Sequence, residues 1–294
     1  MSQAKQHPQK SIESVTNKII CGDSLKILKT FPDNSIDCVV TSPPYGALRD
    51  YGIQEQIGFG MSTEEYLERL VNVFTEIHRV LKSSGTLWVN LGDAYANKTK
   101  GKPRNKPPTG VSDSPNVQAA KLNVPPKSLC LIPSRFALLM IRKGWILRNE
   151  IIWHKPNQMP QSVQDRFTVD FEKLFFFVKE RKYYFNRQFE PLRDPERLKR
   201  RQLDSEKNHK CSDSYWFSTR PEISRKRKLR MLKQGRNKRC VWTIGTASFA
   251  GNHFAVYPER LIETPMLAGC PENGIVLDPF LGSGTTAVVA KKLG

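Results

Sequence analysis

Residues 274–294 read GIVLDPFLGSGTTAVVAKKLG, and this stretch carries three structural signals in succession. An apolar run ends at Asp278, glycines follow at 282 and 284, and a helix-forming segment comes next. Glycine lets the backbone approach a ligand closely, and the first turn of a helix offers unpaired N–H groups. The stretch therefore predicts a strand, a ligand-binding turn and a helix, although the same turn is also compatible with a purely structural strand exit.

The chemistry of this turn limits the ligand. It lacks the lysine of G-x-x-x-x-G-K-[ST] and the third glycine of G-x-G-x-x-G, so it does not indicate a triphosphate cradle. A carboxylate at the end of the strand suits a ligand with ammonium, hydroxyl or sulfonium groups better than a pyrophosphate.

A second apolar run, residues 35–41, ends in the turn Ser42-Pro43-Pro44-Tyr45-Gly46. Two consecutive prolines cannot extend a central strand, because neither has an N–H for the ladder. The turn is either a simple strand exit or a rigid mount for one hydroxyl and one aromatic ring.

The rest of the chain alternates strand and helix patterns. Residues 18–21 and 35–41 with the amphipathic stretch between them predict a parallel strand–helix–strand unit. Ser62 and Glu65 have capping-box spacing before a helix that we expect to end at Gly85, and a strand is expected at 86–93. Further elements are expected as a helix at 131–144, a strand at 145–155, a strand pair or hairpin from 171–179 and 182–186, and a turn and helix at 253–270. This alternation predicts an α/β fold with a doubly wound, mostly parallel, Rossmann-like sheet.

Charge points to a polyanionic partner. The 294 residues carry a net charge of +19, and residues 187–240 hold 18 Lys or Arg against 7 Asp or Glu, a surplus of 11. The apolar run 174–178 is too short to span a bilayer, and the polar N-terminus has no signal core. The six cysteines show no C-x-x-C spacing, so no metal site and no disulfide framework is indicated. A cytoplasmic, nucleic-acid-binding protein fits these features.

The two turns together resemble those of the DNA amino-methyltransferases, whose catalytic turn is (Asp/Asn/Ser)-Pro-Pro-(Tyr/Phe/Trp). The order here, with the catalytic turn first and the glycine turn last, resembles the beta class, a circular permutation of the common methyltransferase sheet. Five further stretches also resemble this family: 22–25, 88–95, 148–157, 171–179 and 253–261.

This resemblance implies S-adenosyl-L-methionine as cofactor and double-stranded DNA as substrate, in a prokaryotic restriction-modification system. It implies direct methyl transfer to an exocyclic amino group on a flipped-out base, with Ser42, Pro43, Pro44 and Tyr45 as catalytic residues. Residues expected around the cofactor are Asp23, His253, Tyr257, Asp278, Phe280, Gly282, Ser283, Gly284 and Thr285. Asp23 is also a candidate helix N-cap, and both roles can coexist.

In the family that the chain resembles, serine at the first position of the turn is associated with N4 of cytosine and aspartate with N6 of adenine, so the resemblance implies cytosine, with N6 of adenine as the alternative. Methylation of RNA or of a protein glutamine, or a non-catalytic DNA-binding role, are further alternatives. The expected DNA contacts are Lys98, Lys100, Lys102, Arg104, Arg225, Lys226, Arg227, Lys228, Arg230 and Arg236. A cognate restriction endonuclease is a candidate partner, and the sequence leaves open a monomer or a homodimer.

The predicted organisation has four parts. Residues 1–17 form a tail, and 18–186 form the catalytic half with a basic loop at 97–129. Residues 187–240 are the inserted target-recognition region, and 241–294 form the cofactor-binding half. The resemblance implies one more strand after Gly294, ending in an acid that binds the ribose. We expect residues beyond Gly294, or a second polypeptide, to supply it, and weak cofactor binding without it.

Overall fold

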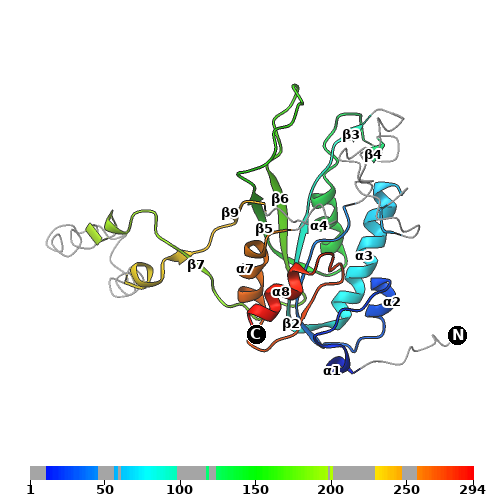
Figure 1. Cartoon of the computed structure of the whole chain (residues 1–294), viewed down its shortest axis with the longest axis horizontal. Helices are drawn as coiled ribbons and strands as arrows, with labels where there is room; N and C mark the ends of the chain where they lie inside the picture. The colour runs from blue at the N-terminus through cyan, green and yellow to red at the C-terminus, as the bar shows by residue number, and fades with distance from the viewer. Residues whose placement is uncertain are drawn as a thin grey trace, which may run out of the picture. The chain divides into compact units, whose positions relative to one another are not determined.

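The computed structural model describes residues 11–45, 56–58, 61–97, 117–118, 124–197, 199–200, 229–246 and 257–294 (Figure 1). It divides into two units, residues 1–186 with 240–294 and residues 187–239. The first unit contains a six-stranded sheet with the order β10-β1-β2-β6-β5-β9. These strands are β1 (Ile36–Thr41), β2 (Leu81–Leu91), β5 (Ile146–His154), β6 (Phe171–Val178), β9 (Val241–Thr243) and β10 (Val276–Leu277).

The sheet is mixed but mostly parallel. β1 is parallel to both β10 and β2, and β5 is parallel to β9, whereas β6 is antiparallel to its neighbours β2 and β5. β10, late in the chain, therefore lies beside β1 and places the two predicted turns at neighbouring strand ends. The predicted α/β class with a Rossmann-like sheet is confirmed.

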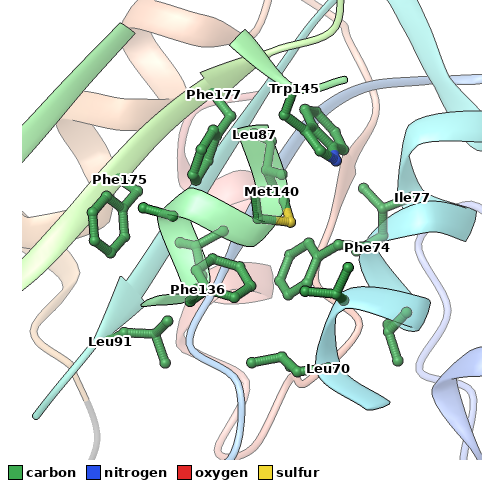
Figure 2. Packing of buried hydrophobic residues seen from close by; sticks show 14 of the residues in the cluster. Leu70, Phe74, Ile77, Leu87, Leu91, Phe136, Met140, Trp145, Phe175 and Phe177 are labelled. Carbon is green, nitrogen blue, oxygen red and sulfur yellow. The ribbon is translucent and has the colours of Figure 1, made fainter. Parts of the chain in front are cut away.

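One face of the sheet is covered by α3 (Thr63–Val80) and α4 (Ile132–Arg142) (Figure 1). Alternate residues of the strands point to this face, because side chains along a strand alternate between its two sides. Figure 2 shows Leu87 of β2 and Phe175 and Phe177 of β6 packed with Phe74 of α3 and Phe136 of α4. The rings of Phe74 and Phe136 meet edge to face, with 5.2 Å between their centroids.

The opposite face packs against α7 (Glu259–Gly269) and α8 (Thr285–Lys292). Trp88 and Phe176, whose side chains point to this face, stack with their ring centroids 4.0 Å apart. Ile262 and Met266 of α7 complete this second apolar cluster. Both faces of the sheet are therefore buried. Side chains that contact a ligand are expected where the strands end, at the carboxyl ends of the parallel strands.

Three expectations about elements were wrong. Residues 18–21 are not a strand: Ile19 is 77% exposed, and no described strand pairs with the segment, so the predicted parallel unit is absent. The helix beginning after Ser62 ends at Val80 rather than Gly85, because Leu81 pairs with Ile36 as the start of β2. Residues 182–186 form no strand, since β6 pairs with β2 and β5 instead.

Short elements complete the first unit. α1 (Ile12–Val15) and α2 (Ser24–Leu28) precede β1, and β3 (Ala96–Asn97) pairs in parallel with β4 (Val117–Gln118). The capping box predicted from Ser62 and Glu65 is present at the start of α3. No helix within the described ranges is long and apolar enough to cross a membrane.

Two short antiparallel strands, β7 (Phe189–Glu190) and β8 (Arg236–Asn237), pair near the two ends of the segment that forms the second unit. Glu190 Oε1 accepts hydrogen bonds from Arg236 Nε at 2.7 Å and from Arg239 Nε at 2.6 Å. Gly235 has φ of +88°, and a Cβ there would lie 2.3 Å from the Glu190 carbonyl oxygen. The β7–β8 pair is therefore supported by the Glu190 carboxylate and leaves no room for a side chain at Gly235.

Candidate active site

The two turns leave the sheet side by side. β1 and β10 run parallel with Cys38 opposite Val276 and Val39 opposite Leu277, so their carboxyl ends meet at one edge. Thr41, the last residue of β1, donates a hydrogen bond from Oγ1 to Asp278 Oδ1 at 2.6 Å. The residue before the diproline turn is thus joined directly to the residue that opens the glycine turn.

Asp278 holds the glycine turn in place. Its Oδ1 also accepts from the Phe280 backbone N–H at 2.9 Å, and its Oδ2 accepts from Thr286 Oγ1 at 2.6 Å and Tyr257 OH at 3.1 Å. Burial raises the pKa of Asp278, while these donors oppose the shift by stabilising the carboxylate. The carboxylate therefore ties together β1, the turn and the first turn of α8.

Tyr257, which lies two residues before the start of α7, is one of the donors to the Asp278 carboxylate. Its hydroxyl also contacts the Thr286 hydroxyl, and burial together with the Asp278 charge raises the pKa of the phenol well above 10. The phenol stays protonated at neutral pH and remains a donor to Asp278.

The glycine turn is open on one side. Gly282 and Gly284 have φ of +55° and +87°, in the left-handed region that glycine adopts without strain. A Cβ on Gly284 would meet no atom within 4 Å, and one on Gly282 would meet only the Phe280 carbonyl oxygen at 3.8 Å. The turn therefore offers bare backbone at the N-terminus of α8 to an approaching ligand.

Asp23 is brought near the glycine turn by the next residue, Ser24, which bonds to that turn. Its carboxylate is exposed and caps α2 by accepting from the Lys26 N–H at 2.8 Å. The next residue, Ser24, donates from Oγ to the Pro279 carbonyl at 2.6 Å. The start of α2 is thereby fixed against the glycine turn, with one exposed carboxylate beside it.

The diproline turn is anchored by hydrogen bonds from three elements. Ser42 Oγ donates to Tyr45 OH at 3.3 Å, and Tyr45 OH donates to Glu172 Oε2 at 2.7 Å, with Asn90 Oδ1 a second acceptor at 3.2 Å. Tyr66 OH of α3 donates to the Pro44 carbonyl at 2.7 Å. Both Ser42 and Tyr45 are therefore held at the edge where β1 and β2 end.

Sequence reasoning missed Glu172, Asn90, Tyr66 and Ser24. Glu172 and Asn90 lie in two of the stretches that resemble the family, 171–179 and 88–95, but the local sequence pattern assigns no role to either residue. The signal that identifies them is sheet topology: β6 enters the sheet where β2 leaves it, so its first residues meet the diproline turn.

Several predicted residues lie outside the described ranges: Lys98, Lys100, Lys102, Arg104, Arg225, Lys226, Arg227, Lys228 and His253. Of the other predicted DNA contacts, Arg230 is exposed within a helical segment at 229–234. Arg236 is engaged by Glu190, so part of its charge is already neutralised within the second unit.

The sheet and its paired turns define a methyltransferase-type fold. The PvuII DNA methyltransferase, described as cytosine-N4-specific, superposes with a TM-score of 0.58 at 21% identity, covering 93% of this chain and 77% of that one. TTHA0409 of Thermus thermophilus, whose structure was solved with S-adenosyl-L-methionine, gives a TM-score of 0.50 at 21% identity, covering 93% of this chain and 84% of that one.

Sequence comparison defines the family. Residues 36–294 match the DNA methylase model of N6 and N4 methyltransferases. The type II methyltransferase M.Cfr9I of Citrobacter freundii is 38% identical over 295 residues, covering 99% of this chain and 85% of that protein. The chain belongs to the DNA methylase family and is a DNA amino-methyltransferase of the restriction-modification type, with S-adenosyl-L-methionine as its methyl donor.

Proposed function

We propose that this chain methylates the exocyclic N4 amino group of cytosine in a flipped-out DNA base by direct displacement. The observation that carries the proposal is the Thr41–Asp278 hydrogen bond, which joins the Ser42–Tyr45 turn to the glycine turn at one edge of the sheet. A hydroxyl, an aromatic ring and an open cofactor turn thereby converge at one place.

The residues at the glycine turn fit the methyl donor. Gly282 and Gly284 leave room for close backbone contact, and the exposed carboxylate of Asp23 suits hydroxyl or amino groups of a nucleoside. Phe280, Ser283 and Thr285 would border the ligand, while Asp278 and Tyr257 would hold the turn behind it. When bound, S-adenosyl-L-methionine supplies an electrophilic methyl group on a sulfonium.

The diproline turn would orient the attacking amine. The lone pair of an exocyclic amino group is delocalised into the ring, which makes the group a poor nucleophile. Ser42 Oγ and the Pro43 carbonyl would accept hydrogen bonds from its two hydrogens, and the rigid prolines would keep these acceptors aligned. The Tyr45 ring would stack on the flipped base. The new nitrogen–carbon bond replaces the methyl–sulfur bond of the donor, which leaves as the neutral thioether, and the methylated amino group releases its extra proton to solvent. No covalent intermediate on the enzyme is needed.

The preference for cytosine rests on Ser42, because serine at this position resembles the N4-cytosine members of the family. N6 of adenine is the alternative, since both targets are amidine-like amino groups. We further propose that the basic segment 187–240 reads the DNA sequence and that a restriction endonuclease of the same specificity accompanies the chain.

Nucleoside analysis tests this function. DNA incubated with the purified chain and S-adenosyl-L-methionine is digested to nucleosides and examined by mass spectrometry. N4-methylcytosine is the expected product. N6-methyladenine alone would overturn the assignment of the base, and methylation of RNA in preference to DNA would overturn the assignment of the substrate.

A further inference from the structure

Glu172 at the start of β6 places a carboxylate in contact with Tyr45 of the diproline turn. Its Oε2 accepts from Tyr45 OH at 2.7 Å, and its Oε1 forms an ion pair with Lys155. Both side chains are largely buried, at 16% and 13% exposed, and Lys155 Nζ also lies 4.4 Å from the centre of the Trp153 ring. The carboxylate is thus fixed in position and paired.

This carboxylate determines which way the tyrosine hydroxyl points. A phenol has one proton to donate, and an ionised carboxylate can only accept. The second acceptor, Asn90 Oδ1, is turned toward Tyr45 because the Asn90 amide donates to the Lys173 carbonyl at 3.2 Å. Both acceptors draw the Tyr45 proton away from Ser42, so the Tyr45 oxygen is left to accept from Ser42 Oγ.

The consequence reaches the group proposed to touch the substrate. A serine hydroxyl in isolation donates or accepts equally well, and a hydroxyl that donated toward the target would compete with the lone pair needed for attack. With its proton engaged by Tyr45, Ser42 Oγ presents only lone pairs to an incoming N–H.

We propose that Glu172 is a positioning residue that polarises the chain Ser42 to Tyr45 to Glu172, so that Ser42 meets the target amino group as a hydrogen-bond acceptor. The inference rests on the proposed role of Ser42. Hydrogen bonds to charged groups are stronger than neutral ones, so the carboxylate supplies to a neutral serine turn a directing charge that the turn itself lacks.

Glu172→Gln tests the proposal while keeping the size of the side chain. The amide can donate to Tyr45, which frees the Tyr45 proton to turn toward Ser42. We expect the single-turnover rate of methylation to fall roughly 10- to 100-fold, with dissociation constants for DNA and S-adenosyl-L-methionine changed by less than about threefold. Glu150→Gln is the matched control: Glu150 pairs with the Lys173 side chain, whereas Asn90 bonds the Lys173 backbone carbonyl, so the substitution leaves the acceptors of the Tyr45 hydroxyl in place and the rate should stay within about twofold of wild type.

A double-mutant cycle shows whether the two residues act as a unit. Tyr45→Phe keeps the ring and removes the hydroxyl, so Tyr45→Phe alone should be slowed about as much as Glu172→Gln, and the double variant should be no slower than Tyr45→Phe. A wild-type rate for either single variant, or losses that add, would overturn the proposal. If Glu172→Gln does not fold, a wild-type rate in Tyr45→Phe overturns it alone. Absence of DNA methylation by the wild type would instead refute the proposed function.

Discussion

Ser42 is the residue on which the proposed chemistry depends most. Its hydroxyl lies at the carboxyl end of a fully buried strand, where the prolines and Tyr66 fix the backbone around it. Such rigidity is what a displacement reaction requires, because the enzyme gains rate by holding acceptors in place before the substrate arrives.

Ser42→Ala is expected to lower the methylation rate by about 100-fold or more, because one preorganised acceptor is lost. Binding of S-adenosyl-L-methionine, followed by isothermal titration calorimetry, should not change, since Thr41 and Asp278 still hold the glycine turn. Ser35→Ala provides the control, because it removes a hydroxyl that donates to the Pro32 carbonyl just before the opposite end of β1. Equal rates for the two variants would remove Ser42 from the mechanism.

Asp278 gives a prediction about pH. Because burial raises its pKa above the ordinary value of 3.8, the folded state holds this proton more tightly than the unfolded chain does. Ionisation of this group therefore costs folding free energy, and the cost grows as pH rises from about 4 through the folded pKa. Asp278→Asn, which resembles the protonated acid, does not incur this cost.

The melting temperature of wild type minus that of Asp278→Asn should consequently decrease between about pH 4 and pH 7. Differential scanning calorimetry of both proteins across this range measures the difference, and titration of all other groups cancels in it. A difference that increases with pH would mean that the four donors outweigh burial.

Among the elements, those set by local signals were predictable from sequence. The Ser62 capping box begins α3, and the apolar stripe of α3 faces the sheet as its periodicity indicates. Pairing across the sheet was not predictable: residues 18–21 have strand composition but no described partner, and Leu81 continues the helical pattern yet joins a ladder with Ile36. Likewise, both turns of the candidate site follow from local sequence, whereas Glu172 reaches Tyr45 across 127 positions only through the antiparallel β2–β6 pairing.

The pairing of β7 with β8 in the second unit can be tested by substituting Gly235. Gly235→Ala should disrupt the β7–β8 pairing, because its Cβ would overlap the Glu190 carbonyl, and residues 187–239 should become more sensitive to limited proteolysis. Gly144→Ala is the matched control, since Gly144 also has a positive φ, +95°, but its Cβ would meet nothing within 4 Å. Both variants share the cost of the left-handed backbone, about 1 kcal/mol, so only the clash distinguishes them. Equal proteolysis of residues 187–239 in the two would contradict this role.

At the scale of the whole molecule, charge is the feature that bears on the encounter with DNA. A surplus of +19 favours any polyanion, and the concentration of basic residues in 187–240 would direct that attraction to this one segment, the proposed DNA-reading region. Arg236 and Arg239 are partly neutralised by Glu190, which leaves Arg230 and Lys233 among the exposed described cations of this segment.

Replacing both Arg230 and Lys233 by alanine should weaken DNA binding and reduce the slope of log affinity against log salt by about 2, one for each lost phosphate contact. Fluorescence anisotropy at several salt concentrations measures this slope. The same loss of charge at Arg142 and Lys143, exposed at the end of α4, should change it less. An equal effect at both places would indicate general attraction rather than a DNA-binding segment.

The proposed function requires the two turns to serve one reaction: the diproline turn holds the flipped base, and the glycine turn holds the methyl donor. A crystal structure of the chain with its DNA and a non-reactive analogue of the methyl donor tests it most directly, through the distances from the target amino nitrogen. We expect a cytosine N4 at about 2.7–3.2 Å from both Ser42 Oγ and the Pro43 carbonyl, with the analogue against Gly282 and Gly284. A target base beyond hydrogen-bond reach of Ser42, or an analogue bound away from the glycine turn, would contradict it.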